Sequence, residues 1–150
     1  MTVHPEWMAR IECKFHGDPR LIAGAATIVA HIARRAGLSE PVASEISAVA
    51  IEACNAIFQE EDEPANSRAM VQLSAAEFPD HIEISTQLLS RSSNAGRSQR
   101  SSGLPADLAG KLRQELKNAA VDGVDVEITD GIPHITLVKN CGAANRRFAV

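Results

Sequence analysis

The fold class follows from the stretch RIECKFHGDPRLIAGAATIVAHIARRAG, from Arg10 to Gly37, because its hydrophobic period changes in the middle. Apolar and polar residues alternate over 10–16, which predicts a β-strand. Asp18 and Pro19 then supply a helix N-cap and a first helical position. Apolar residues recur every three or four positions from there to Gly37. The stretch therefore predicts a strand followed by an amphipathic helix.

The rest of the chain continues this alternation of strand and helix patterns. Ser39 caps a second helix whose apolar stripe runs to Ile57, and a third helix is expected from about Pro105 to Ala120. Four further strands are expected, at 69–75, 81–88, 124–129 and 134–139. The order β-α-α-β-β-α-β-β predicts an α+β two-layer sandwich, with a mixed, mostly antiparallel sheet covered on one face by about three helices.

Length and composition predict one domain over residues 1–150, with a core that needs no metal or disulfide. The segment 90–103 is rich in serine and arginine and almost free of apolar residues, so we expect a flexible loop there. The tail from 140 to 150 is expected to be loose. The chain is thus organised around a single apolar core.

Charge and cysteine usage exclude several classes of protein. Lys and Arg number 15 against 19 Asp and Glu, for a net charge of -4, so a general nucleic-acid binder is not expected. The three cysteines form no Cys-x-x-Cys pair, which argues against zinc ribbons and disulfide frameworks. Charges interrupt the apolar stretches, including the first 15 residues, so the sequence predicts a cytoplasmic protein without a membrane span or signal peptide.

One carboxylate and one amide stand close together in the second predicted helix, in the segment Glu52-Ala-Cys-Asn55. Residues three apart on a helix project from the same face. Such a pair can hold a hydrated divalent cation and orient a reacting hydroxyl. The alternative is an ordinary solvated helix face, and spacing alone does not separate the two.

Over roughly residues 8 to 139 the sequence resembles the anti-sigma factor serine/threonine kinases of bacterial partner-switching systems. The resemblance rests on element order, on Gly-Leu-Ser-Glu from Gly37 to Glu40, and on Glu-Ala-Cys-Asn-Ala from Glu52 to Ala56. These kinases belong to the GHKL superfamily of histidine-kinase-like ATPases. The resemblance implies the Bergerat fold of that superfamily, Mg-ATP as cofactor and a protein serine or threonine as substrate.

The resemblance also implies roles for individual residues. Glu52 would be the general base, and Asn55 would bind the nucleotide and its magnesium ion. In Ser-Gly-Leu, Gly103 and Leu104 match the glycine box that binds phosphate, although Gly103 could equally be only a helix cap. Thr136 would contact the adenine site from the last hairpin.

Three departures from the family pattern stand in the sequence. Glu52 and Asn55 are three residues apart instead of four, and Gln59 replaces the family's histidine. The aspartate-glycine box, whose aspartate accepts a hydrogen bond from adenine, is expected after the strand 81–88. Residues 86–91 there read Thr-Gln-Leu-Leu-Ser-Arg, with no acidic residue and no glycine. The nucleotide site is therefore expected to be degenerate.

Three functional hypotheses stay open. The first is an ATP-dependent anti-sigma kinase, and the second is a degenerate relative that acts only as a protein-binding module in transcription regulation. Both imply a sigma factor or an antagonist-like protein as partner, with homodimers as in related proteins. The third is a phosphoryl-relay or nucleic-acid protein that uses His31 or the arginines of the loop 90–103.

The first predicted helix carries a mildly basic strip opposite its apolar face. It consists of Arg20, Thr27, His31 and Arg34. Such a strip could steer an acidic partner electrostatically, with binding that weakens as salt rises. The alternative is that these residues only solubilise the helix.

Overall fold

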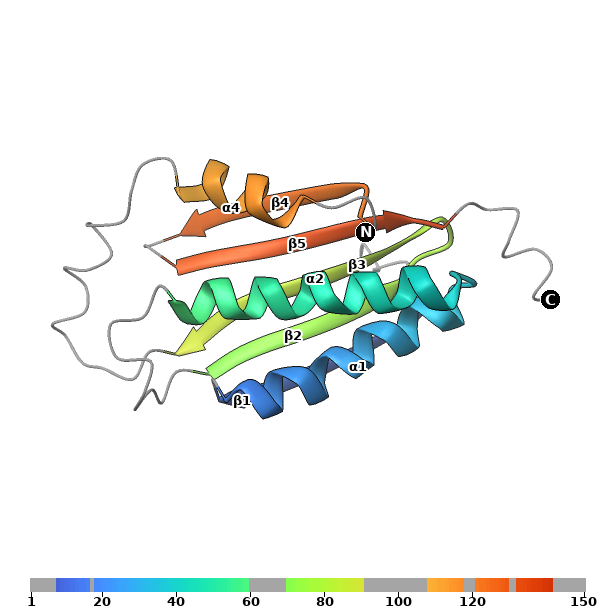
Figure 1. The fold of residues 1–150 in the computed structure, drawn as a ribbon, viewed down its shortest axis with the longest axis horizontal. Helices are drawn as coiled ribbons and strands as arrows, with labels where there is room; N and C mark the ends of the chain where they lie inside the picture. Colours follow the sequence, from blue (N-terminus) through green and yellow to red (C-terminus); the bar gives the residue numbers. More distant parts are fainter. Residues whose placement is uncertain are drawn as a thin grey trace, which may run out of the picture.

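Five strands form one antiparallel sheet in the computed structural model, which describes residues 8–16, 18–59, 70–90, 108–117, 121–129 and 132–141 (Figure 1). The strands are β1 (Ala9–His16), β2 (Met70–Glu77), β3 (His81–Ser90), β4 (Gly123–Thr129) and β5 (Ile132–Asn140). Their order in the sheet is β1-β2-β3-β5-β4. Every pairing between these strands is antiparallel, so the mixed character expected of the sheet is not observed.

Three helices cover one face of the sheet, as Figure 1 shows: α1 (Pro19–Arg35), α2 (Glu40–Gln59) and α4 (Leu108–Leu116). The predicted cap of α1 is confirmed, since Asp18 Oδ1 accepts a hydrogen bond from the Arg20 N–H at 2.8 Å. Gly37 follows α1 with a φ of 94°, a left-handed conformation that glycine adopts without strain. The chain can therefore reverse at once into α2.

The core lies between the helices and the sheet and is almost entirely aliphatic. Alternate strand residues such as Ile84 and Leu137, which lie opposite each other on β3 and β5, are completely buried. The stripe of α2 that faces them includes Ile46 and Ile57. Many of the buried positions on α1 and α2 are alanines, which allows the two helices to pack closely. Ser47 Oγ also donates a hydrogen bond to the Ala26 carbonyl at 2.9 Å.

This packing accounts for the apolar composition of α2. Within the described residues, α2 is the one helix long and apolar enough, over Glu40–Phe58, to cross a membrane. Half of that window is buried inside the fold. The helix is thus placed as the central core helix of a soluble-type α+β fold.

The main differences from expectation lie at element ends. Strand β2 continues past 75 to Glu77, because its last residues still pair with β1. Helix α4 spans Leu108–Leu116, and residues 105–107 and 118–120 of the predicted helix lie outside the described residues. Ser90 and Asn140 belong to β3 and β5 and not to the predicted loop and tail. The remainder of that loop and most of that tail, residues 91–103 and 142–150, lie outside the described residues.

A partly buried ion pair ties the end of α1 to the sheet. Arg35 Nε donates a hydrogen bond to Glu77 Oε1 at 2.7 Å. The Glu77 side chain is only 3% exposed, whereas that of Arg35 is 51% exposed. A carboxylate so far removed from water needs charged or hydrogen-bonding neighbours.

We predict that Arg35→Met lowers the free energy of unfolding by about 1–3 kcal/mol, because it removes a cation from a buried carboxylate. The matched control is Arg34→Met, which removes an exposed pair with Glu40 and should cost less than about 1 kcal/mol. Urea unfolding measures both. Equal losses in the two variants would contradict the assigned importance of the Arg35–Glu77 pair.

The first residue of β3, directly after the turn that follows β2, is a histidine placed between two carboxylates. His81 Nδ1 lies 2.6 Å from Asp80 Oδ1, and His81 Nε2 lies 3.0 Å from Glu83 Oε2. The ring also stacks on Phe78, with centroids 4.6 Å apart. Partial burial alone would lower the pKa of His81, but the hydrogen bonds and charges of Asp80 and Glu83 outweigh it and raise that pKa.

We predict that His81 stabilises the fold more at pH 6 than at pH 8. Its pKa is higher in the folded than in the unfolded chain, so the contribution is complete below the unfolded pKa and disappears as pH rises through the folded pKa. The difference in unfolding free energy between wild type and His81→Gln should shrink by up to about 1 kcal/mol over this range. In a background carrying Asp80→Asn and Glu83→Gln, only burial acts on the His81 pKa, so this decrease with rising pH should disappear. Its persistence there would refute the assignment.

Candidate functional site

Glu52 and Asn55 lie on the side of α2 that faces away from the sheet. Both are exposed, whereas Ala53 and Cys54 between them are buried. Ile51, four positions before Asn55, packs against the core, so the place of the family's glutamate is held by an apolar side chain. The predicted carboxylate–amide pair is thus a pair of neighbours on an open helix surface.

Thr136 lies on the opposite face of the sheet. Its neighbours along β5, Ile135 and Leu137, are fully buried against the helices, and side chains alternate between faces along a strand. Thr136 is directly opposite Ser85 on β3 and Asp125 on β4, on the face that α1, α2 and α4 do not cover. The sheet therefore separates Thr136 from the helix that carries Glu52 and Asn55.

The remaining predicted nucleotide ligands, Gly103 and Leu104, lie outside the described residues, as do the arginines of the predicted loop. The described residues include no group of three or more His, Cys, Asp or Glu side chains that could hold a metal ion. Glu52, Asn55 and Thr136 do not meet in one pocket, so this part of the chain does not fit a bound Mg-ATP.

The basic strip of α1 is largely neutralised by nearby carboxylates. Arg20 pairs with Asp18 at 3.3 Å, and its hydrogen bonds lower the pKa of that carboxyl group. Arg34 pairs with Glu40 at the start of α2. His31 is exposed on the same helix. The strip therefore offers less positive charge to a partner than its sequence indicates.

A thiol and a hydroxyl meet in the core beneath α2. Cys54 is buried, and this burial raises the pKa of its thiol to about 12, with the nearby Thr86 hydroxyl acting in the opposite direction. Thr86 is itself 1% exposed, and its hydroxyl completes no hydrogen bond of normal geometry. At neutral pH this thiol stays protonated, so Cys54 is a core residue and not a nucleophile.

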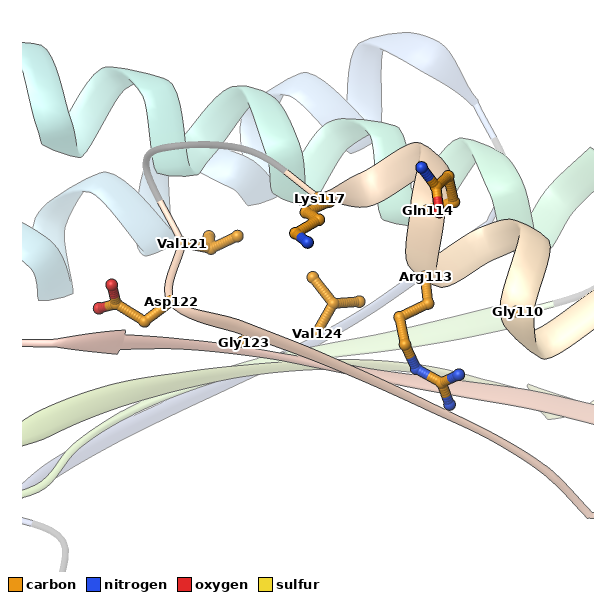
Figure 2. A pocket seen from close by; sticks show the side chains of 8 residues that line it. All are labelled: Gly110, Arg113, Gln114, Lys117, Val121, Asp122, Gly123 and Val124. Atoms are coloured by element: carbon orange, nitrogen blue, oxygen red, sulfur yellow. The ribbon is translucent and has the colours of Figure 1, made fainter.

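A cleft of about 780 Å³ lies between α4 and the start of β4 (Figure 2). Its size is within the range of ligand-binding cavities in proteins. One wall is a face of α4 and the other is the chain entering β4. The residues that line it are Gly110, Arg113, Gln114, Lys117, Val121, Asp122, Gly123 and Val124.

The cleft has an apolar floor and a cationic wall. Val121 is buried and Val124 is half-buried. Figure 2 shows the Lys117 side chain between α4 and Val124, and the Arg113 side chain reaching toward the strand farther along. Arg113 Nη2 donates a hydrogen bond to the Val126 carbonyl oxygen at 3.4 Å. The two cations are therefore spread along the strand.

The one carboxylate in the cleft wall is held by the neighbouring strand. Asp122 Oδ2 accepts a hydrogen bond from the Asn140 N–H at 2.6 Å and lies 3.8 Å from Lys139 Nζ. Within the described residues, neither Arg113 nor Lys117 forms an ion pair. The cleft thus presents positive charge that is not neutralised, on a chain whose net charge is -4.

The sequence carries a signal for the helix wall of this cleft but not for the cleft itself. Arg113 and Lys117 are four apart on one face of α4, and Leu112 and Leu116 form the buried face. The second wall is not visible in the sequence, because it depends on where β4 lies in the sheet.

Comparison with models of known protein families gives no match, and comparison with curated proteins gives no similar sequence.

Proposed function

We propose that the protein is a non-catalytic regulator that acts by binding a partner protein. In this proposal it is a degenerate relative of the anti-sigma kinases that keeps a two-layer α+β fold and has lost the nucleotide site. The kinase alternative is weaker because Glu52 and Asn55 do not converge with Thr136.

The separation of Glu52 and Asn55 from Thr136 is the observation that carries the proposal. Phosphoryl transfer depends on positioning, because the base, the magnesium ion and the nucleotide must lie within a few ångströms of one another. Here an exposed helix face and the far side of a sheet carry the candidate groups. The aspartate expected to accept a hydrogen bond from adenine is also missing after Leu88.

The resemblance in sequence supports the choice of partner. A partner-switching protein without a kinase site can still bind a sigma factor or the antagonist that competes for it. Such binding would take place in the cytoplasm, where sigma factors act. The third hypothesis includes phosphoryl relay through His31. A single exposed histidine on α1 does not support it.

We predict that Mg-ATP and Mg-ADP give no binding heat at millimolar concentration in calorimetric titration, and that the Asn55→Ala variant behaves identically. The reason is that no described pocket unites Asn55 with an adenine acceptor. Micromolar ATP binding that Asn55→Ala abolishes would show an intact nucleotide site and overturn the proposal.

We further predict that a sigma factor or partner-switching antagonist of the same cell binds the purified protein without nucleotide. Glu52→Gln and Asn55→Ala should leave its affinity within about twofold of wild type, because neither residue has a catalytic role. Surface plasmon resonance against each sigma factor and antagonist of the host measures this. Binding that depends on added ATP, or no binding to any of them, would contradict the proposed function.

A further inference from the structure

We propose that the cleft between α4 and β4 binds an acidic peptide segment in extended conformation, which adds to the edge of β4 that no described strand pairs with. The inference rests on the proposed function, because it names the partner surface of a protein-binding module. The position of the cleft beside β4, the place of β4 at an edge of the described sheet and the charges that line the cleft support it.

One wall of the cleft is the chain that enters β4. Its lining residues follow the chain from Val121 to Val124, and Arg113 contacts the strand again at Val126. At about 3.3 Å per residue, the lining chain from Val121 to Val124 spans roughly 10 Å. An extended segment of about four residues matches this length, whereas a small anion would occupy only part of it.

The strand that forms this wall, β4, is an edge strand of the described sheet. In the described part of the chain, β4 pairs with β5 on one side and with no strand on the other. An extended peptide can add to such an edge through main-chain hydrogen bonds, while a neighbouring helix contacts its side chains. The α4 face with Gly110, Arg113 and Lys117 is placed to make those contacts.

A bound peptide can replace the hydrogen bond that Arg113 donates to the Val126 carbonyl oxygen at the edge of β4. This bond is 3.4 Å long, beyond the usual length of about 2.9 Å for such a bond. A peptide N–H can take over that oxygen while the guanidinium group turns to an acidic side chain of the peptide. The exchange replaces one long hydrogen bond with a main-chain bond and a charge-assisted bond.

The charges that line the cleft favour an acidic peptide. Arg113 and Lys117 have no carboxylate partner within the described residues, and Asp122 is engaged with Asn140 and Lys139. Two cations spaced along the strand favour acidic side chains at alternate peptide positions. The apolar floor at Val121 and Val124 favours small aliphatic side chains between them.

The test uses the full chain and a fluorescent peptide, acetyl-Glu-Val-Glu-Val-Glu-amide, measured by anisotropy at low and moderate salt. We expect saturable binding that weakens with salt. The double variant R113E/K117E should weaken it by at least about tenfold. The control Lys111→Glu reverses a single charge elsewhere on α4 and should alter affinity by less than about twofold. Circular dichroism establishes that the variants are folded, and Lys117→Gln serves in place of the double variant if that one unfolds.

Three comparison ligands separate the alternatives. A Lys-Val-Lys-Val-Lys peptide should not bind, and Glu-Pro-Glu-Pro-Glu should bind at least about tenfold more weakly because proline has no N–H to donate to the edge. Glutarate should not compete at millimolar concentration. Amides of β4 should gain hydrogen-exchange protection when the valine peptide binds.

Failure of this inference is distinguishable from failure of the proposed function. No peptide binding, equal binding of the proline peptide, or competition by glutarate would overturn the peptide site. A sigma factor or antagonist that still binds R113E/K117E with unchanged affinity would also overturn it, while the proposed function would stand. Tight ATP binding that is the same in wild type and in R113E/K117E would overturn the proposed function.

Discussion

Side-chain alternation along five paired strands is the constraint on which the rest of the structure depends. Because successive residues point to opposite faces, a shift of one residue would move a whole strand's apolar set out of the core. The register that buries Ile135 and Leu137 under the helices also places Thr136 on the far face. The alternation that buries the core residues therefore also determines the face of the sheet on which Thr136 lies. The helices obey an equivalent constraint, since the stripe that buries Ile46 and Ile57 turns Glu52 and Asn55 outward.

Local patterns were sufficient to predict the elements but not how they assemble. The cap at Asp18 and the turn at Gly37 were predicted because each depends on nearby residues, and the structure confirms both. The order β1-β2-β3-β5-β4 was not predicted, because pairing depends on contacts between distant segments. For the same reason the sequence showed Arg113 and Lys117 on one helix face but not the edge strand opposite them. A motif such as Glu-Ala-Cys-Asn-Ala likewise predicts which residues are neighbours on a helix. It does not predict which part of the fold those residues face.

Three surfaces of the described residues remain for function once the core is accounted for. The face of the sheet that carries Thr136, Ser85 and Asp125 is polar, and the strip on α1 has its arginines paired with Asp18 and Glu40. The cleft beside α4 differs from both, because it combines a concave shape, an apolar floor and cations without carboxylate partners in the described part of the chain. These properties favour recognition of another chain over chemistry on a nucleotide.

The central claim is that Asn55 and Thr136 belong to no common nucleotide site. Nuclear magnetic resonance of ¹⁵N-labelled protein during titration with Mg-ATP tests it most directly, because the Asn55 side-chain amide and the Thr136 backbone amide report separately. The account predicts that neither signal moves up to millimolar ATP. Movement of both signals along one saturable binding curve would contradict it.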